Sequence, residues 1–381
     1  MFNVLTLNKI AAIGTSRLGE GYSYGEDVQN PDAILVRSAA MHDMDFADNL
    51  LAIARAGAGT NNIPKDKCSE QGIVVFNTPG ANANAVKELV LAGLLLASRK
   101  IVEGIDWAKT LKGNGDAVGK MVEKGKSQFV GPEITGKTLG VIGLGAIGIL
   151  VANAAAALGM QVIGFDPFMS VPNALKLDPS VKLMKSNEEV MVNCDYLTIH
   201  VPLTPETKDL VDAEMIAKMR DGVRILNYSR DGLVNAQAVL DAIKSGKVAK
   251  YVTDFGNDLI LGEENVIVLP HLGASTPESE DNCAVMACDQ VKEYLENGNI
   301  INSVNYPAIS LPRTAGTKRI CVMHKNVPEL IKSVLGEISA NVENMLSKSR
   351  GDYAYTIIDV AGDVNADSIA AVDGVVRVRV I

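Results

Sequence analysis

The segment from Thr138 to Asp166 constrains the fold more than any other part of the sequence. An apolar stretch that ends at Ile142 leads directly into GLGAIG at Gly143 to Gly148, and small and apolar residues follow. Asp166 ends the next apolar stretch, 18 residues after Gly148. A strand, a glycine-rich turn, a helix and an acidic strand end, in this order, predict a βαβ unit that binds a dinucleotide.

The residues of this motif have physical roles in such a site. Gly143 allows a tight turn, Gly145 lets a pyrophosphate approach the backbone, and Gly148 allows the helix to pack closely against the strand. Backbone N–H groups at the start of the helix would face the phosphates. Because Asp166 would accept hydrogen bonds from ribose hydroxyls and would repel a 2′-phosphate, the pattern favours NAD over NADP.

Strand and helix patterns alternate after residue 138, which predicts a doubly wound parallel sheet of the Rossmann type. The predicted strands are Thr138–Ile142, Gln161–Phe165, Tyr196–Ile199, Val223–Asn227, Lys250–Thr253 and Val266–Leu269. Short apolar runs between residues 33 and 79 predict a second α/β domain, closed by a helix over Ala83–Ser98.

The C-terminal part reads as a separate small α+β unit. The stretch from Asn302 to Lys318 contains Pro307, Pro312 and Gly316, and it looks like a linker. After it, strands are predicted over Arg319–Met323, Tyr353–Val360 and Gly374–Val380, with a helix over Val327–Asn341.

The composition excludes several classes of function. Lysine and arginine number 36 against 45 aspartates and glutamates, a net charge of −9, which argues against binding nucleic acid through its phosphates. The longest apolar stretch, Leu89 to Ala97, is far shorter than the roughly 20 residues of a membrane helix, and no secretory signal is evident. We therefore expect a cytoplasmic protein that does not bind membranes. The five cysteines are scattered without a C-x-x-C pair, so no metal site is predicted.

Two residues at predicted strand ends have the chemistry of a dehydrogenase site. His271 follows the last strand, at the carboxyl edge where doubly wound folds bind ligands, and is a candidate proton acceptor and donor. Arg230 follows the strand that ends at Asn227, and its planar guanidinium suits a bidentate pair with a substrate carboxylate. His200 ends an earlier strand and is interpreted as a structural residue beside the cofactor. The set indicates hydride transfer to or from a 2-hydroxy acid.

Five motifs, in the same order along the chain, resemble those of the D-isomer-specific 2-hydroxyacid dehydrogenases. They are Gly143–Gly148, Phe165-Asp166-Pro167, His200-Val201-Pro202-Leu203, Asn227-Tyr228-Ser229-Arg230 and Pro270-His271-Leu272-Gly273-Ala274-Ser275-Thr276. Val36-Arg37-Ser38, the run from Arg55 to Asn62 and Asn77-Thr78-Pro79 resemble the members of the family that act on 3-phosphoglycerate. The resemblance covers almost the whole chain.

The resemblance implies which residues bind cofactor and substrate. Those implied for NAD are Thr78, Gly143, Gly145, Ala146, Ile147, Gly148, Asp166, His200, Val201, Pro202, Tyr228, Ser229, Asp254, Gly273 and Ala274. Those implied for the substrate are Arg37, Ser38, Arg55, Gly57, Arg230 and His271, with Arg37 and Arg55 holding a phosphate. It also implies a discontinuous, flavodoxin-like substrate domain at 1–100 and 283–305, a dinucleotide-binding domain at 101–282, a linker at 306–318 and a regulatory domain at 319–381.

Two positions depart from the family pattern. Relatives pair the catalytic histidine with a glutamate five residues after the aspartate that is Asp254 here, and this chain has Leu259 at that position. Asp258 is the first candidate to replace the glutamate, and Asp254 is the second. The other departure is Lys87, where relatives tend to carry a small residue; it either contacts a substrate phosphate or is solvated.

The residues from 319 onward resemble an ACT domain, a small amino-acid-binding module with β-α-β-β-α-β order. His324-Lys325-Asn326-Val327-Pro328 matches its ligand loop, and Asn344 falls where relatives supply a second amide. However, Glu329 replaces the usual glycine, and only Val364–Gly374 remain for the second helix. We expect either serine binding at His324, Asn326 and Asn344, or a domain that only pairs subunits in a homodimer or homotetramer.

Two classes of function remain open at this point. The first is an NAD-dependent dehydrogenase that oxidises 3-phosphoglycerate in the first step of serine biosynthesis, or acts on another small D-2-hydroxy acid or its keto form, such as glycerate, hydroxypyruvate, glyoxylate or lactate. The second is a catalytically idle protein that binds NAD and responds to it. Retention of Arg230 and His271 does not separate the two classes, because corepressors that share this fold can keep the same residues. The phosphate-compatible arginines Arg37 and Arg55 and the C-terminal regulatory domain favour the enzyme.

Overall fold

A computed structural model describes residues 1–381, which form two compact units. The first unit contains Met1–Asn82 and Thr276–Ile381, and the second contains Ala83–Ser275. None of the helices has the length and apolar character needed to cross a bilayer.

The second unit is built on a seven-stranded parallel sheet with the order β12-β11-β10-β9-β6-β7-β8. Its strands are β6 (Thr138–Ile142), β7 (Gln161–Phe165), β8 (Lys182–Leu183), β9 (Tyr196–Ile199), β10 (Val223–Asn227), β11 (Val248–Thr253) and β12 (Val266–Val268). Strand order reverses between β6 and β9, so the carboxyl ends of these two strands flank the switch point where doubly wound folds bind ligands. The predicted Rossmann architecture is confirmed.

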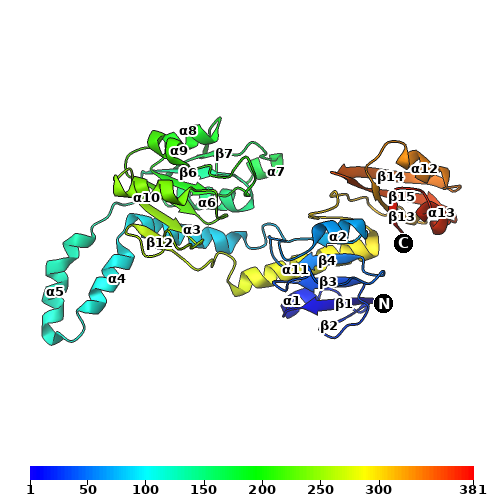
Figure 1. The fold of residues 1–381 in the computed structure, drawn as a ribbon, viewed down its shortest axis with the longest axis horizontal. Helices are drawn as coiled ribbons and strands as arrows, with labels where there is room; N and C mark the ends of the chain where they lie inside the picture. Colours follow the sequence, from blue (N-terminus) through cyan, green and yellow to red (C-terminus); the bar gives the residue numbers. More distant parts are fainter. The chain divides into compact units, whose positions relative to one another are not determined.

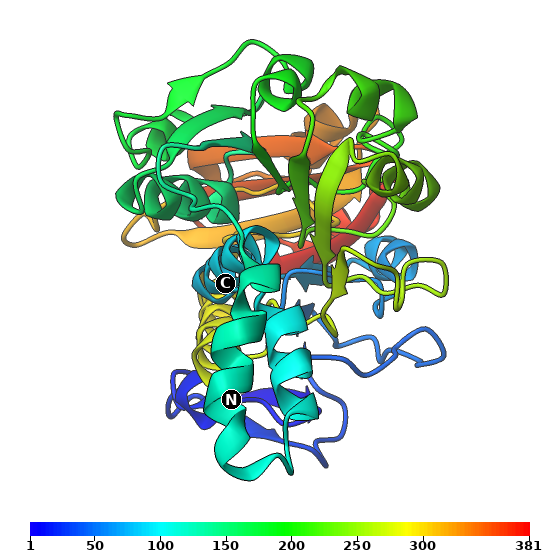
Figure 2. The same ribbon diagram turned by 90° about the vertical axis from the view of Figure 1, so that its left-hand side faces the viewer.

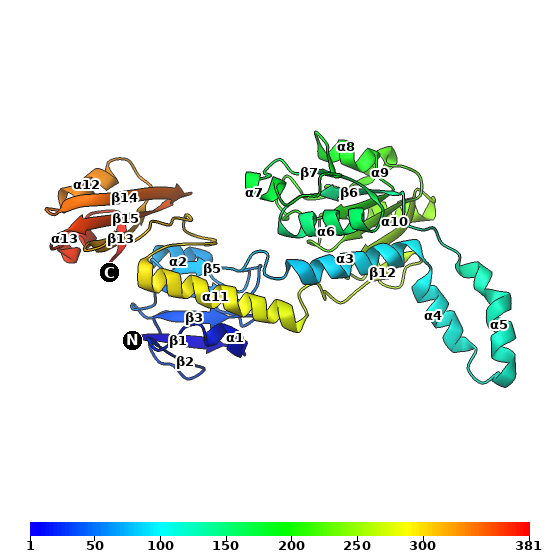
Figure 3. The same cartoon turned by 180° about the vertical axis from the view of Figure 1, so that it is seen from behind.

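Helices cover both faces of this sheet (Figure 3). On one face lie α3 (Ala83–Ser98) and α6 (Ala146–Ala157), whose apolar side chains share a core with β6, β7 and β11. On the other lie α8 (Asn187–Val192), α9 (Ala213–Lys218) and α10 (Ala236–Lys244), which share a core with β9 and β10. A one-turn helix, α7 (Val171–Ala174), follows β7. The helix predicted to close the first domain, α3, thus packs with the second unit.

A helical hairpin extends from the second unit after α3 (Figure 2). It consists of α4 (Ile101–Thr110), a 3₁₀ turn at Gly115–Ala117, α5 (Val118–Gly125) and a second 3₁₀ turn at Lys126–Phe129. Neither helix has a buried residue, and the rings of Trp107 and Phe129 pack 5.2 Å apart between the arms. Lys250 of β11, which is buried, forms an ion pair with Glu103 and ties the hairpin to the sheet.

The first unit contains a five-stranded parallel sheet with the order β2-β1-β3-β4-β5 (Figure 1). Its strands are β1 (Phe2–Leu7), β2 (Tyr22–Gly25), β3 (Ala33–Val36), β4 (Ala52–Arg55) and β5 (Val74–Phe76), and its helices are α1 (Ala12–Thr15), α2 (Lys65–Glu70) and α11 (Pro277–Asn297). The 21-residue α11 buries one face against this sheet, and Gly298 ends it in the left-handed conformation.

The C-terminal residues of the same unit form a four-stranded antiparallel sheet with the order β14-β15-β13-β16. Its elements are β13 (Lys318–Lys325), α12 (Leu330–Gly336), β14 (Asn341–Arg350), β15 (Tyr353–Ala361), α13 (Ala366–Ala370) and β16 (Val375–Val380). The order β-α-β-β-α-β is as expected. The helix predicted over Val327–Asn341 was too long. The observed helix α12 ends at Gly336, and Asn341, the last residue of the predicted helix, belongs to β14.

The stretch predicted as a linker is partly buried, up to Leu311, and mostly exposed after it. Tyr306, Ile309 and Leu311 are at most 8% exposed, and Ile309 pairs with Ile300 in an antiparallel bridge. One face of the C-terminal sheet joins the core that contains α11, through residues such as Tyr355 and Ile357. The C-terminal sheet therefore packs against the rest of the first unit and is not joined to it by a flexible tether alone.

Candidate active site

The glycine-rich turn between β6 and α6 has the shape that a dinucleotide requires. Gly143 has φ +86°, and a Cβ there would lie 2.6 Å from the carbonyl oxygen of His200. A Cβ at Gly148 would collide with the carbonyl of Gly143, whereas open space surrounds Gly145. Gly145 begins α6 without a side-chain cap, so the first N–H groups of the helix, including those of Ala146 and Ile147, are available to an anion.

Asp166 lies at the end of β7 beside this turn. Its Oδ2 accepts a hydrogen bond from the N–H of Leu144 at 2.9 Å, and its Oδ1 accepts one from Phe168 at 2.8 Å. The carboxylate is thus held at the edge of the turn and keeps lone pairs for ribose hydroxyls.

We expect Asp166→Ala to weaken NAD binding and to reduce the preference of the protein for NAD over NADP. The loss should be about 1.5–3 kcal/mol, the usual contribution of a hydrogen bond to a charged group. Fluorescence titration with NADH and NADPH measures both affinities. Phe168→Ala, an exposed neighbour with no predicted contact, is the matched control. Preference of the unmodified protein for NADPH would contradict the role of Asp166.

Three buried polar atoms at neighbouring strand ends lack a partner within the chain: Nδ1 of His200, Oη of Tyr228 and Oδ1 of Asp254. Burial lowers the pKa of His200 to about 4, so its ring is neutral, and its Nε2 contacts Oγ1 of Thr198 at 3.0 Å. The Tyr228 hydroxyl lies against Gly93 of α3, where any side chain would displace it. Because unpaired buried polar groups are costly, these atoms fit a bound cofactor with matching donors and acceptors.

The backbone around Arg230 is held by Asn227, the last residue of β10. The buried Asn227 side chain donates to the carbonyl of Arg230 at 2.9 Å and accepts from the N–H of Ser229 at 3.2 Å. Ser229 donates its hydroxyl to the carbonyl of Val201 at 2.6 Å, beside Pro202. The guanidinium of Arg230 is itself exposed, so it can approach a carboxylate.

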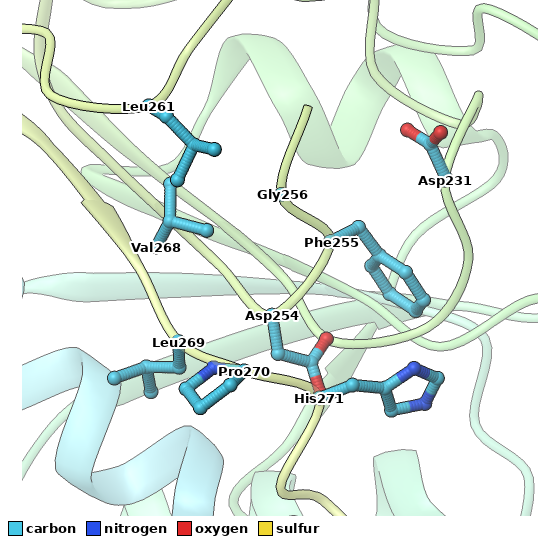
Figure 4. Close-up of a pocket in the computed structure, with 9 residues that line it drawn as sticks. All are labelled: Asp231, Asp254, Phe255, Gly256, Leu261, Val268, Leu269, Pro270 and His271. Atoms are coloured by element: carbon cyan, nitrogen blue, oxygen red, sulfur yellow. The ribbon is translucent and has the colours of Figure 1, made fainter. Parts of the chain in front are cut away.

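His271 and Asp254 meet at a cavity of about 500 Å³ in the second unit (Figure 4). His271 follows β12 with φ +43°, an uncommon backbone conformation for a residue other than glycine, and its exposed ring packs edge-on against Phe255 at 4.9 Å. Asp254 is 3% exposed. Burial raises the pKa of Asp254, and the nearby positive charges of His271 and Arg230 partly oppose that rise.

The structure favours one of the two aspartates that the sequence predicted as partners of His271. Asp254 lines the cavity with His271, whereas the exposed Asp258 does not. Asp231 also lines it, across from the Phe255 ring (Figure 4). Sequence reasoning missed Asp231, although its position directly after Arg230 at a strand end was a usable signal. Gly273, in the loop after His271, packs against Val86 of α3, and Ala274 next to it is exposed.

The residues implied for the substrate phosphate lie together in the first unit. Nη2 of Arg37 pairs with Oε1 of Glu280 at 2.6 Å, and Nε of Arg55 donates to the Arg37 carbonyl at 3.1 Å. Arg55 lies over Gly57, where any side chain would collide with its guanidinium. Oδ1 of Asn8 accepts from the N–H groups of Arg37, Ser38 and Ala39. Neither Asn8 nor Glu280 was predicted, and no sequence motif marks either of them.

Two further predicted residues have distinct surroundings. Thr78, after β5, is completely buried, and its Oγ1 has no partner within the chain. Lys87 of α3 has a mostly buried side chain, 19% exposed, and its Nζ lies 3.5 Å from Oε1 of Glu88, so it is neither free nor fully solvated.

The residues proposed to bind serine do not converge within the chain. His324 is 3% exposed, and its ring nitrogens already contact the Lys325 carbonyl and Oγ1 of Thr356. Asn326 donates to the Gly351 carbonyl. Strand register pairs Asn344 of β14 with Asp359 of β15, and Asp359 in turn pairs with Arg319 of β13. Arg319 is five positions along β13 from His324, or roughly 17 Å at the rise of a β-strand.

Comparison with known proteins adds independent findings. Residues 91–273 match the NAD binding domain of the D-isomer specific 2-hydroxyacid dehydrogenases. The D-3-phosphoglycerate dehydrogenase of Mycobacterium leprae (strain TN) is 36% identical over 369 residues, which cover 91% of this chain and 67% of that protein. The same enzyme of Haemophilus influenzae (strain ATCC 51907 / DSM 11121 / KW20 / Rd) is 30% identical, with 89% and 83% covered.

Solved structures share the fold. A glyoxylate reductase from Paecilomyes thermophila superposes with a TM-score of 0.65 at 23% identity, over 80% of this chain and 98% of that one. An NAD⁺-bound 3-phosphoglycerate dehydrogenase of Entamoeba histolytica gives 0.60 at 24% identity, over 80% and 98%. The chain belongs to the D-isomer-specific 2-hydroxyacid dehydrogenase family, and NAD is its cofactor.

Proposed function

We propose that the protein oxidises D-3-phosphoglycerate to 3-phosphohydroxypyruvate with NAD, the first step of serine biosynthesis. Relatives named for this activity in bacteria, an archaeon and a yeast align over most of the chain. The observation that carries the proposal is the arrangement of Arg230, Asp254 and His271, which follow the adjacent strands β10, β11 and β12 of the NAD-binding sheet. Chain order and strand order thus bring a cation, a carboxylate and an imidazole to one edge.

Each of these three side chains has a separate role in the reaction. Arg230 pairs with the substrate carboxylate and fixes the orientation of C2. The exposed imidazole of His271 takes the proton from the C2 hydroxyl, and NAD bound beside it would supply the acceptor for the hydride that leaves C2. The buried carboxylate of Asp254 offsets the positive charge that His271 acquires. Oxidation therefore releases one proton to His271, and the imidazole passes it to water before the next turnover.

A second candidate is oxidation of a D-2-hydroxy acid without a phosphate, such as D-glycerate or D-lactate. The pairing of Arg37 with Glu280 favours it, because Glu280 neutralises a cation that would otherwise hold the phosphate. Both side chains are 43% exposed, so the pair is weak and can exchange for a phosphate dianion.

Initial rates of NADH formation from D-3-phosphoglycerate, D-glycerate and D-lactate distinguish these functions. The proposal expects the highest kcat/KM with D-3-phosphoglycerate. A higher value with D-glycerate or D-lactate would favour the second candidate. No rate with any of the three, despite NADH binding, would identify a binding protein without catalysis.

We expect Asp254→Asn to lower kcat by about 10²-fold, within the range that acid–base catalysis contributes, whereas Asp258→Asn leaves kcat unchanged. The reason is that only Asp254 lines the cavity with His271. Burial displaces the pKa of Asp254 above its ordinary value, so the carboxylate is lost as pH falls through that raised pKa. A pH profile of kcat should therefore lose an acidic limb in Asp254→Asn alone. The opposite pattern, a large loss in Asp258→Asn, would assign the role to Asp258.

We further propose that the C-terminal domain pairs subunits in a homodimer or homotetramer. Its edge strand β14 exposes Val342 and Met345, and strand edges are common pairing surfaces. Serine should bind weakly or not at all, because burial lowers the pKa of His324 and its ring nitrogens are occupied. Isothermal titration calorimetry with L-serine tests this expectation, and a micromolar dissociation constant would contradict it.

A further inference from the structure

The first unit contains a cavity that the proposed reaction does not use. Its volume is about 650 Å³, within the usual range for small-molecule sites. One face of α11 forms its floor, and the loop after β5 and the segment Ile301–Asn302 complete its walls. None of the candidate catalytic or substrate residues lines it.

Gln290, which lines this cavity, contains a buried hydrogen-bond acceptor without a partner. Gln290 of α11 is 4% exposed, and its Nε2 donates to the carbonyl of Asn77 at 3.1 Å. Its Oε1 has no partner within the chain. Rotating the amide by 180° would place Oε1 against the Asn77 carbonyl, so this orientation is the favoured one. Leaving a buried acceptor unpaired is costly, which points to a ligand that donates a hydrogen bond.

The charge of the walls restricts that ligand further. Asp289 and Glu293 line the cavity, and no lysine, arginine or histidine does. Asp289 is paired with Arg17, but Glu293 accepts hydrogen bonds only from the amides of Asn297 and Asn299 and has no cationic partner. An anion such as a phosphorylated hydroxy acid is therefore repelled, and a cation is favoured.

Two observations favour an organic cation over a bare metal ion and indicate the rest of the ligand. No group of three or more histidine, cysteine or carboxylate side chains is arranged to hold a metal. Val285, Met286 and Ile301 supply apolar wall, and methionine adapts its shape to hydrocarbon. The ligand thus has an ammonium end that reaches Gln290 and Glu293, and a hydrocarbon part beside the apolar residues.

We propose that this cavity binds a small organic ammonium compound at a site separate from the NAD and hydroxy-acid sites. Gln290 accepts a hydrogen bond from the ammonium group, Glu293 supplies the opposite charge, and the Val285–Met286 side takes the alkyl chain. Because Gln290 also holds the Asn77 carbonyl, an occupied site contacts the loop that carries Thr78.

Isothermal titration calorimetry of the full-length protein with pentylammonium tests the proposal, with 1-pentanol and pentanoate as probes that lack the positive charge. Pentylammonium should bind saturably at concentrations up to about 10 mM, and the other two should not. Gln290→Met, which keeps the side-chain length and removes the acceptor, should weaken binding about tenfold or more. Glu293→Gln should weaken it in the same direction.

The matched control is Gln237→Met, which changes an exposed glutamine of α10 that donates to Asp241. Its binding of pentylammonium should equal that of the unmodified protein. Circular dichroism verifies the fold of each variant, and the half-exposed Glu293 supplies a second test if Gln290→Met misfolds. No saturable binding, equal binding of 1-pentanol or pentanoate, or unchanged affinity in the folded Glu293→Gln variant would overturn the proposal.

Discussion

Replacement of His271 by asparagine should lower kcat by about 10²- to 10⁴-fold, the contribution expected from a general base, while the affinity for NADH is largely kept. Asparagine is the suitable replacement because His271 has φ +43°, and asparagine tolerates the left-handed region better than most residues. The variant therefore removes the proton acceptor without forcing the loop into a new backbone conformation. Steady-state rates and fluorescence titration with NADH measure the two effects separately.

His42→Asn is the matched control for this experiment. His42 is exposed in the first unit, where its Nε2 contacts the carbonyl of Asn61 at 2.9 Å, and it has no place in the proposed reaction. Its kcat should match that of the unmodified protein. Near-normal turnover in His271→Asn would overturn the assignment of the base, and loss of NADH binding would show that the loop was disrupted instead.

Arg319→Met should lower the free energy of unfolding by about 3–5 kcal/mol, because it leaves a carboxylate buried without its partner. Arg319 and Asp359 have completely buried side chains joined by two hydrogen bonds of 2.7 and 2.8 Å. The remaining N–H groups of Arg319 donate to the carbonyls of Asn297, Leu311 and Pro312. One guanidinium thus joins the C-terminal sheet, the end of α11 and the buried stretch between them.

Urea denaturation measures this loss, and Arg313→Met, at an exposed arginine that donates to the Ile381 carbonyl, should change stability by less than about 0.5 kcal/mol. Adding Asp359→Leu to Arg319→Met should recover part of the loss, since no charge is then buried alone. If the double variant is less stable than Arg319→Met, the loss in Arg319→Met does not come from an unpaired buried carboxylate.

The same pair predicts how stability depends on pH. Burial alone would raise the pKa of Asp359, but Arg319 and Thr314 outweigh it, and the pKa is lowered. A carboxyl with a lowered folded-state pKa contributes stability that is complete above its unfolded pKa of about 3.9 and is lost as pH falls through the folded value. Stability should thus fall below about pH 4, and Asp359→Leu should reduce that dependence.

Much of the NAD-binding sheet could be predicted from the sequence. Strands β6, β7, β9 and β10 have the predicted bounds, because each is a mostly apolar run between turn residues and is largely buried. Strands β1, β2, β8 and β14 were not predicted, and for β8 and β14 the reason is physical. Strand β8 is two exposed residues, and β14 is exposed along most of its length, so neither shows an apolar periodicity.

The candidate site divides in the same way. Gly143, Arg230 and His271 were found because local motifs at strand ends mark them. The choice between Asp254 and Asp258 depends on how the chain turns between β11 and β12, which local sequence does not determine. Glu280 is 243 residues from Arg37 along the chain, and only the packing of the first unit brings the two side chains together.

The attachment of the C-terminal sheet has a consequence for how the protein can vary. Arg377 donates to the carbonyls of Leu50 and Asp48, Arg379 to those of Tyr294 and Leu295, and Arg350 to that of Ser303. Every residue type supplies a backbone carbonyl, so these hydrogen bonds do not depend on which side chains the rest of the first unit carries. Substitutions on that side leave the acceptors in place, whereas replacement of any of these arginines removes the donors. The surface that supplies the carbonyls should therefore tolerate substitutions better than the surface that supplies the arginines.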